Sequence, residues 1–292
     1  MKNLLLGCTM LFVWILAAAE GIQEFDYPET KIISIQDHAS RFPQSLFFAA
    51  EQTEFKQTEK SYEGSVNVFL IVNKKNGAAA LIDAGFGETA GGKLSGKLRE
   101  LKIDPEKVNA VFITHIHPDH VGGLAQAAGK DGTMTPCFPK AAICIAKEEY
   151  EAWKKDEKRV RLAQYLTPCE SQLKLIDYDK ELTGDFGILI PRRAAGHTPG
   201  HTVFEKIIPL RTPNEKKESI FFVGDILHAA DLQVTNYQYC ARFDQDPRMA
   251  AETRRKAFLK YNGSWFGAHF PFPGKIRIHQ DAPNVFSYKK AK

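Results

Sequence analysis

The segment THIHPDHVGG at residues 114–123 carries three histidines and one aspartate within six consecutive positions. It continues the run AVFIT at residues 110–114, whose apolar character is typical of a short buried strand. Imidazole and carboxylate groups are the ligands that Zn, Mn or Fe prefer in proteins. Surface histidines or an affinity tag are the alternatives, but a tag lies at a terminus and lacks the preceding strand. The segment therefore predicts a metal site at the end of a buried strand.

Local geometry allows all four donors to face one cavity. His115 and His117 are separated by one isoleucine, so both point the same way in extended backbone. Pro118 then breaks the strand and turns the chain before Asp119 and His120. One tetrahedral zinc ion needs only three protein ligands and a water. Four donors in one loop therefore predict two metal ions.

Two metal ions need more ligands than this loop supplies, and three later segments offer them. His197 lies in the turn GHTPGH, Asp225 ends the apolar run FFVGD, and His269 lies in GAHF. Taken singly, each is more often a hydrogen-bonded polar residue than a ligand. A carboxylate that follows a strand and a glycine can reach into a site and bridge two ions.

In this order the motifs resemble those of the metallo-β-lactamase superfamily, over roughly residues 65–275. The resemblance implies an α/β fold, the αββα sandwich of two packed mixed β-sheets with outer helices, and a site at the edge between the sheets. The ligands that it implies are His115, His117 and His197 for one metal, Asp119, His120 and His269 for the second, and Asp225 as the bridge. It also implies that Asp83, in LIDAG, supports the site through hydrogen bonds.

Asp225 favours the dinuclear hydrolase branch, because true metallo-β-lactamases lack this bridging aspartate. HPDHVGG, GHTPGHT and AHFPFPG are most similar to methyl parathion hydrolase-like proteins, and acyl-homoserine lactonase-like proteins are also similar. The resemblance implies an enzyme with two divalent ions, zinc first and Mn, Fe or Co as alternatives, that share a bridging hydroxide. Its substrate is expected to be a small, largely neutral ester or lactone, or a phosphotriester, with Asp225 or Asp119 moving the proton. A β-lactam hydrolase and a non-catalytic metal-binding module are the alternatives.

Three aromatic residues and one further histidine are candidates for the substrate pocket. The resemblance places Trp153 in the pocket wall, with a core position on an amphipathic helix as the alternative. Phe270 and Phe272 follow the last ligand and are expected at the mouth, unless they pack in the core. His228, three residues after Asp225, could donate a hydrogen bond to a developing oxyanion or be satisfied by local backbone.

The other histidines lack such a context. His201 is expected to fix its own turn by a hydrogen bond, because it shares the GHTPGH motif with His197. His38 and His279 are expected at the surface.

Residues 1–19 have the pattern of a secretory signal peptide, with Lys2, an apolar core and a run of three alanines at the end. A membrane anchor fits less well, because Leu4 to Ala19 is shorter than the about 20 residues of a bilayer span. Lipidation at Cys8 fits less well too, because only a few apolar residues precede it. Cleavage after Ala19 leaves one metallo-β-lactamase-like domain, residues 20–292, expected in the periplasm or secreted and without stable membrane association.

Composition and charge narrow the partners further. The chain is 43% hydrophobic and 25% charged, and its net charge of +4 comes without a long basic run, so nucleic acid is not an expected partner. A small-molecule substrate is expected, and a homodimer is common among relatives. The four cysteines after residue 19 are Cys137, Cys144, Cys169 and Cys240. They allow two disulfides in three pairings, or free buried thiols.

Periodicity and turn residues predict the remaining elements. Strands are expected at residues 65–72, 78–82, 110–114, 141–146, 187–190, 202–208 and 219–223, and helices at residues 94–101, 147–166 and 247–261. Residues 73–77 are expected to link a hairpin, and residues 20–60 to wrap the surface. Asp246 or Asp244 is expected to cap the last helix.

Overall fold

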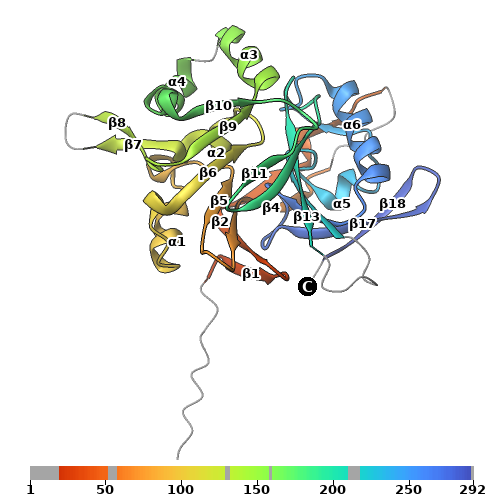
Figure 1. Cartoon of the computed structure of the whole chain (residues 1–292). Coiled ribbons are helices and arrows are strands. Elements are labelled where there is room, and N and C mark those ends of the chain that lie inside the picture. Colours follow the sequence, from red (N-terminus) through yellow and green to blue (C-terminus); the bar gives the residue numbers. More distant parts are fainter. Residues whose placement is uncertain (1–19, 52–57, 129–131, 158–159, 210–217, 291–292) are drawn as a thin grey trace, which may run out of the picture.

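The computed structural model describes residues 20–51, 58–128, 132–157, 160–209 and 218–290, so the predicted signal peptide lies outside the described residues. Two seven-stranded sheets pack together, with helices on the outside (Figure 1). This arrangement confirms the predicted α/β sandwich of two packed mixed sheets. Within the described ranges, no helix is both long enough and apolar enough to span a bilayer.

The first sheet has the strand order β1-β2-β4-β5-β6-β9-β10. Its strands are β1 (Ile22–Asp26), β2 (Thr30–Pro43), β4 (Ser61–Asn73), β5 (Ala79–Ile82), β6 (Val108–Ile113), β9 (Ala142–Ala146) and β10 (Leu173–Ile176). The strands from β1 to β5 pair antiparallel, whereas β5, β6, β9 and β10 pair in parallel. β4 and β5 form the hairpin that the sequence predicts.

The second sheet has the order β11-β12-β13-β14-β16-β17-β18. Its strands are β11 (Leu182–Gly184), β12 (Gly187–Arg193), β13 (Thr202–Ile208), β14 (Glu218–Gly224), β16 (Ser264–Gly267), β17 (Lys275–Ala282) and β18 (Val285–Lys290). Only β14 and β16 pair in parallel. Two small ribbons join β3 (Phe47–Ala49) to β15 (Tyr239–Ala241) and β7 (Ala125–Ala128) to β8 (Thr133–Pro136).

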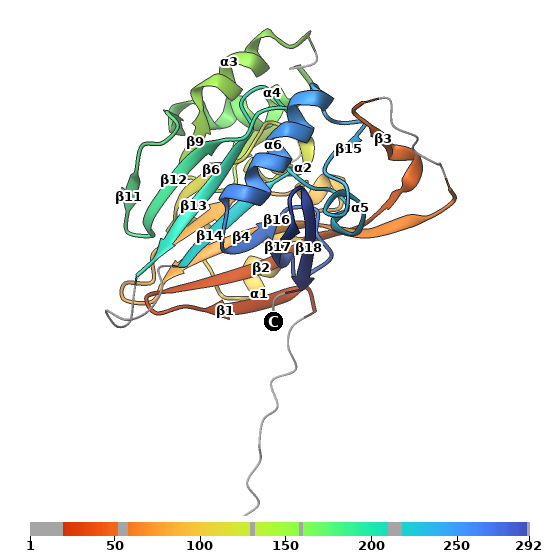
Figure 2. The ribbon, with the colours of Figure 1, turned by 90° about the vertical axis from the view of Figure 1, so that its right-hand side faces the viewer.

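The helices lie on the outer faces of the two sheets. They are α1 (Leu94–Glu100), α2 (Pro118–Val121), α3 (Lys147–Lys155), α4 (Val160–Leu166), α5 (Ala230–Gln233) and α6 (Pro247–Lys260). Short 3-10 turns occupy Gln44–Leu46, Glu88–Ala90, Pro105–Lys107, Gly122–Leu124 and Thr167–Gln172. Figure 2 shows α6 crossing the outer face of the second sheet. Asp246 caps α6, because its side chain accepts the backbone N–H of Met249 at 3.0 Å.

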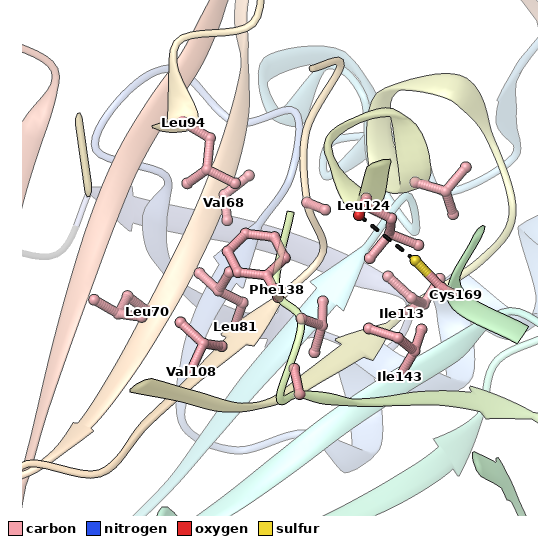
Figure 3. Packing of buried hydrophobic residues seen from close by; sticks show 14 of the residues in the cluster. Val68, Leu70, Leu81, Leu94, Val108, Ile113, Leu124, Phe138, Ile143 and Cys169 are labelled. Atoms are coloured by element: carbon pink, nitrogen blue, oxygen red, sulfur yellow. Dashed lines mark hydrogen bonds between the residues drawn. The ribbon is translucent and has the colours of Figure 1, made fainter. Parts of the chain in front are cut away.

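Alternating side chains on the strands build separate cores on the two faces of the first sheet. On β4, Phe69 and Ile71 point to the space between the sheets, where Phe222 and Phe266 of the second sheet meet them. The intervening Leu70 points to the opposite face. There the side chains of Val68, Leu70, Leu81, Val108 and Ile143 pack with Leu94 and Phe138 (Figure 3). Successive residues of β4 therefore pack into cores on opposite faces of the first sheet.

Two predictions about secondary structure are wrong. Residues 20–60 do not simply wrap the surface, because β1 and β2 join the first sheet and the side chains of Ile32 and Ile35 on β2 are fully buried. The single helix expected at residues 147–166 is two helices. α3 ends before Asp156, whose backbone is extended, and α4 begins at Val160.

The four cysteines after residue 19 are free thiols rather than two disulfides. Cys144 packs between the sheets. Cys169 belongs to the cluster of Figure 3, where its thiol lies 3.6 Å from the carbonyl oxygen of Leu124. The apolar packing around these two thiols shows that they act as small core residues.

Lys206 is a buried cation whose effect on stability depends on pH. Its Nζ donates to the carbonyl oxygen of Phe186 at 3.1 Å, and burial lowers the pKa of Lys206 to about 8. Below pH 8 the folded and unfolded states both carry the proton, so the cost of burying the charge is present in full. Between pH 8 and the unfolded pKa, near 10.4, only the unfolded state keeps the proton, and stability rises with pH.

We therefore expect Lys206→Met to be more stable than the wild type by about 2 kcal/mol at pH 7. The difference should shrink towards zero at pH 10, where the wild-type amine is neutral in the folded state. Urea unfolding of both proteins at the two pH values measures it. An equal difference at pH 7 and pH 10 would show that the pKa of Lys206 is not lowered.

Candidate metal centre

The predicted ligands meet at one edge of the sandwich. Residues 114–117 leave β6, the turn that contains His197 links β12 to β13, Asp225 follows β14, and His269 follows β16. Because β14 and β16 are parallel, their carboxyl ends lie at the same edge of the second sheet. A backbone hydrogen bond of 2.8 Å from Thr202 to Thr114 ties the two sheets together there.

Pro118 separates the two pairs of donors in the HxHxDH loop. His117 has extended backbone, with φ −118° and ψ 161°, and Pro118 occupies the first turn of the short helix α2. Proline is favoured there because its fixed φ suits a helix. Its lack of an N–H costs nothing, because N–H groups in the first turn have no acceptor within the helix. The helical turn carries Asp119 and His120 away from the strand direction that His115 follows.

The first group of donors contains His115, His117, His197 and Asp225. His117 Nδ1 lies 3.0 Å from His115 Nε2 and 3.1 Å from His197 Nε2. The Oδ2 atom of Asp225 lies 3.3 Å from His197 Nε2 and 3.7 Å from His115 Nε2. Three imidazole nitrogens and one carboxylate oxygen therefore converge on one point.

The second group contains Asp119, His120 and His269, and Asp225 again lies beside it. Asp119 Oδ2 lies 3.7 Å from His120 Nε2 and 3.4 Å from His269 Nε2. Asp225 Oδ1 lies 3.2 Å from His120 Nε2, and Asp225 Oδ2 lies 3.0 Å from His269 Nε2. Asp225 therefore contacts both groups, as expected of a bridging carboxylate.

The donor sets fit two divalent cations. A zinc ion with bonds of about 2.1 Å in a tetrahedron holds its ligand atoms about 3.4 Å apart, and the separations above lie between 3.0 and 3.7 Å. His120 Nε2 and Asp225 Oδ1 are buried, and neither makes a hydrogen bond within the described residues. Buried polar atoms without partners are rare, and a shared cation satisfies both.

Burial also sets the protonation that metal binding needs. Burial lowers the pKa of His117 to about 3 and that of His115 well below its ordinary value, so both imidazoles are neutral. Burial acts to raise the pKa of Asp225, but the surrounding histidines, His269 foremost, outweigh it and hold that pKa well below its usual range. Two lone pairs and one carboxylate are therefore available near pH 7.

Asp83 supports the second group, as the sequence predicts for a residue behind the ligands. Its Oδ2 lies 2.7 Å from His120 Nδ1, which leaves His120 Nε2 for a metal. Asp83 also accepts the backbone N–H of Thr114 at 2.8 Å and its hydroxyl at 2.9 Å. Thr114 Oγ1 in turn lies 3.1 Å from His115 Nδ1, so one carboxylate orients ligands of both groups.

Asp244 orients His197, a role that the sequence did not reveal. Its Oδ1 lies 2.8 Å from His197 Nδ1, and its Oδ2 lies 3.6 Å from Arg254 Nη2 and accepts the backbone N–H of Ala241. Asp244 and Arg254 are both buried. Burial alone would lower the pKa of His197. The hydrogen bonds to Asp225 and Asp244 outweigh this effect and raise the pKa of His197 to about 9. A metal must therefore displace a proton from His197 near pH 7.

Glu149 is a second residue that the sequence did not identify. Its carboxylate is 3% exposed and lies on α3. It accepts the backbone N–H of Ile116 at 2.8 Å, the hydroxyl of Thr198 at 2.8 Å and the backbone N–H of Gly200 at 2.9 Å. These three hydrogen bonds join the HxHxDH loop to the GHTPGH turn and so fix the distance between their ligands.

His201 does not act within its own turn, which corrects the prediction. Its Nε2 accepts the backbone N–H of Asp225 at 3.0 Å, and burial lowers its pKa to about 3, so the ring is a neutral acceptor. Gly224 permits this contact, because a Cβ there would lie 2.6 Å from His201 Nε2. His38 is exposed and His279 half-buried, and neither belongs to the metal groups.

A cavity of about 370 Å³ opens over the two groups. Besides ligands, its described walls are Ser40, Phe42, Val66, Phe86, Pro118, His228 and Phe243. The prediction for Phe270 is wrong, because its side chain is fully buried in the core beneath the second sheet. Phe272 is half-buried and lies outside the lining of this cavity. Trp153 lines a neighbouring groove rather than this cavity.

His228 borders the cavity next to the bridging carboxylate. Its Nε2 lies 3.2 Å from Asp225 Oδ2, and its ring stacks on His269 with centroids 4.9 Å apart. Its backbone N–H is held by Gln233 Oε1 at 2.7 Å. Asp225, His228 and His269 also lie close enough together to hold a cation.

We expect Gly196→Ala to displace His197. Gly196 has φ +130°, and a Cβ there would lie 2.3 Å from the backbone nitrogen of Ala250, which cannot give way without moving α6. The variant should lose about 2 kcal/mol or more of stability and bind metal more weakly. Thermal unfolding and metal titration measure both effects. Gly77→Ala is the control, because Gly77 also has positive φ but nothing lies within 4 Å of its Cβ position.

An αββα sandwich with two histidine and aspartate groups at its edge defines a class of metal-binding proteins. The chain belongs to the metallo-beta-lactamase superfamily, whose family model matches residues 61–262. The match includes all the predicted ligands except His269, which lies seven residues beyond its end. Superfamily and donor set together make the protein a metal-dependent hydrolase.

Solved structures with the same fold include several hydrolases. The hydrolase AbOPH of the beta lactamase superfamily is 23% identical, covers 94% of this chain and 99% of its own, and has a TM-score of 0.77. AidC, a dizinc quorum-quenching lactonase, is 21% identical over 93% of this chain and 98% of its own, with a TM-score of 0.75. A probable metal-dependent hydrolase from Staphylococcus aureus is 15% identical over 92% and 99%, with a TM-score of 0.68. No curated protein matches the sequence.

Proposed function

We propose that the protein is an exported hydrolase with two zinc ions that cleaves a small ester or lactone. The observation that best supports this substrate class is the cavity over the metal groups. Apart from the ligands, its described walls contain three phenylalanine side chains and one valine side chain. They contain no lysine, no arginine and no further carboxylate. An uncharged reacting group with apolar neighbours matches such walls. AidC is described as a lactonase, which agrees with this proposal.

Two bound divalent ions would supply the positive field that lowers the pKa of water towards neutrality. Asp225 lies between the two groups and is suited to orient the attacking water by accepting a hydrogen bond from it. Asp119 is the more exposed carboxylate, with 18% of its side chain accessible, and is suited to pass a proton to the leaving group. His228, which borders the cavity with Nε2 close to Asp225, is suited to donate a hydrogen bond to the developing oxyanion.

A β-lactam hydrolase is the second candidate, because the superfamily includes such enzymes. Penicillins and cephalosporins carry a carboxylate close to the amide bond that is cut. This carboxylate needs a cationic partner within the inner cavity, and the described wall residues include none. The cavity therefore favours neutral substrates, with a phosphotriester as the next option after esters and lactones.

A substrate panel tests the proposed function. Purified protein without residues 1–19 is assayed with an acyl-homoserine lactone, an aryl ester, a phosphotriester and a cephalosporin, each with added Zn or Mn. We expect turnover of the lactone or the aryl ester and little turnover of the cephalosporin. Efficient turnover of the cephalosporin alone would instead support the second candidate. Full activity of Asp119→Ala would exclude the metal groups from the reaction.

The proposed export rests on the sequence of residues 1–19, from Lys2 to the three alanines before Glu20. We expect the full chain, expressed in a bacterium, to accumulate outside the cytoplasm with Glu20 as its first residue. Amino-terminal sequencing of the exported protein tests this expectation. Recovery of an intact protein that begins at Met1 would contradict it.

A further inference from the structure

A second hollow, of about 640 Å³, adjoins the metal cavity and is here called the outer groove. His117, Pro118 and Phe243 line both the cavity and the outer groove, so the two spaces meet at these side chains. A small ester or lactone fits within the inner 370 Å³ alone. The outer groove therefore offers space for a further part of the substrate.

Aromatic and aliphatic side chains form the apolar surface of the outer groove. Trp153 on α3 and Leu162 on α4 line it from one side, and Phe243 lies at the junction with the metal cavity. The side chain of Phe243 is 45% exposed, which is unusual for so large an apolar group. An exposed phenylalanine beside a catalytic cavity is suited to contact an apolar chain of a ligand.

Three cations from separate segments converge on the same groove. They are Lys155 at the end of α3, Arg161 in α4 and Arg242 in the loop after β15. None of them forms an ion pair with a carboxylate among the described residues. Arg242 is positioned by its Nε–H, which donates to the carbonyl oxygen of Ser45 at 2.9 Å. Its two terminal nitrogens remain for a ligand.

The carboxylates of the groove do not cancel these charges. Glu149 is buried and accepts three hydrogen bonds from the ligand loops, and buried Asp244 is paired with His197 and Arg254. Asp156 is the one exposed carboxylate among the described lining residues. The outer groove is therefore cationic and apolar at once, whereas the described walls of the inner cavity carry no cation.

We propose that the outer groove selects an ester or lactone whose apolar arm ends in an anionic group. The reacting bond lies in the inner cavity, the arm runs past Phe243 and Trp153, and the anion meets Arg161, Arg242 and Lys155. Arginine binds carboxylate and phosphate by the same forked hydrogen bonds, so either group can end the arm. This inference rests on the proposed ester or lactone hydrolysis.

Matched substrates test the proposal. Three 4-nitrophenyl esters of equal chain length end in a methyl group, a carboxylate or a phosphate. We expect kcat/KM to be about tenfold higher for at least one anionic ester than for the neutral ester, mainly through a lower KM. Because the cations are exposed, 0.5 M NaCl should reduce this preference to about twofold. The relative rates of the two anionic esters identify the preferred terminus.

Charge-removing variants locate the effect. Arg161→Gln and Arg242→Gln should each reduce the preference for the anionic ester about threefold. Arg248→Gln is the matched control, because Arg248 is an exposed arginine on α6 that does not line the groove. The control should keep the preference of the wild type. An equal loss in all three variants would assign the preference to overall charge and overturn the proposal.

A binding assay separates this proposal from the proposed function. If no ester is hydrolysed, the corresponding unreactive anilides are titrated while the fluorescence of Trp153 is recorded, with Trp153→Phe as the control for signal. Tighter binding of the anionic anilide, weakened in Arg161→Gln, supports the groove although the proposed hydrolysis has failed. Equal kcat/KM for neutral and anionic esters, or equal binding of the two anilides, overturns the proposal.

Discussion

Asp225→Asn is expected to lower kcat by roughly 100- to 1,000-fold and to reduce the metal content from two ions per chain towards one. The reason is the position of Asp225, whose two oxygens lie within 3.0 to 3.3 Å of ligand nitrogens in both groups. An amide keeps the size of the side chain but removes the negative charge that two nearby cations require. The imidazole ligands are neutral and supply no negative charge, so the repulsion between the two cations would be less well compensated.

Metal content by mass spectrometry and turnover of the best substrate measure this effect. Asp281→Asn is the matched control, because Asp281 lies on the exposed β17–β18 hairpin outside the metal groups. It should keep the wild-type metal content and activity. Two tightly bound ions and full turnover in Asp225→Asn would contradict the bridging role.

Asp244→Ala is expected to weaken metal binding about 10- to 100-fold and to destabilise the fold by about 3–5 kcal/mol. The substitution removes one carboxylate with two roles. Its Oδ1 is the hydrogen-bond partner of His197 Nδ1, and its Oδ2 is the only carboxylate oxygen that pairs with buried Arg254 among the described residues. His197 then loses the orientation that aims its Nε2 at the first group. Arg254 keeps its hydrogen bonds to the carbonyl oxygens of Ile226 and Tyr239 but becomes an uncompensated buried charge.

Two further variants separate orientation from stability. Asp244→Asn keeps an oxygen for His197 and should recover most of the metal affinity but not the stability that the charge provides. Asp246→Ala removes the cap of α6, two residues away, and should cost about 1 kcal/mol of stability without a change in metal affinity. Competition with a chromophoric chelator gives the affinity, and thermal unfolding gives the stability. Unchanged affinity in Asp244→Ala would show that His197 needs no partner.

The sequence was most informative where local chemistry and local geometry coincide. The donors from His115 to His120 follow a buried strand and a proline, and each of these features acts over a few residues. The strands at residues 65–72 and 202–208 were predictable for a similar reason, because each is a short run rich in β-branched and aromatic residues. The resemblance to one superfamily added the order of the distant ligands, and the family match confirms the superfamily.

The predictions for Phe270 and for β2 were wrong because both depend on contacts with distant segments of the chain. Phe270 follows His269 directly, yet its side chain packs against Gly267 in the core while His269 turns to the metal groups. The long β2 was missed because Asp37 and Gln36 interrupt its apolar pattern. The side chain of Asp37 is buried and accepts the backbone N–H groups of Phe86, Lys93 and Leu94, contacts that no local pattern reveals.

By itself, the sequence determined which atoms can bind metal, because imidazole and carboxylate donors are properties of the residues. It also determined that a turn at Pro118 divides these donors into two pairs. Only the tertiary structure decided how they are held: Asp244 behind His197, and Glu149 between Ile116 and Gly200. Only the tertiary structure placed three cations beside a neutral cavity. The physical reason is that these contacts join segments far apart in the chain, and their positions follow from the packing of the two sheets.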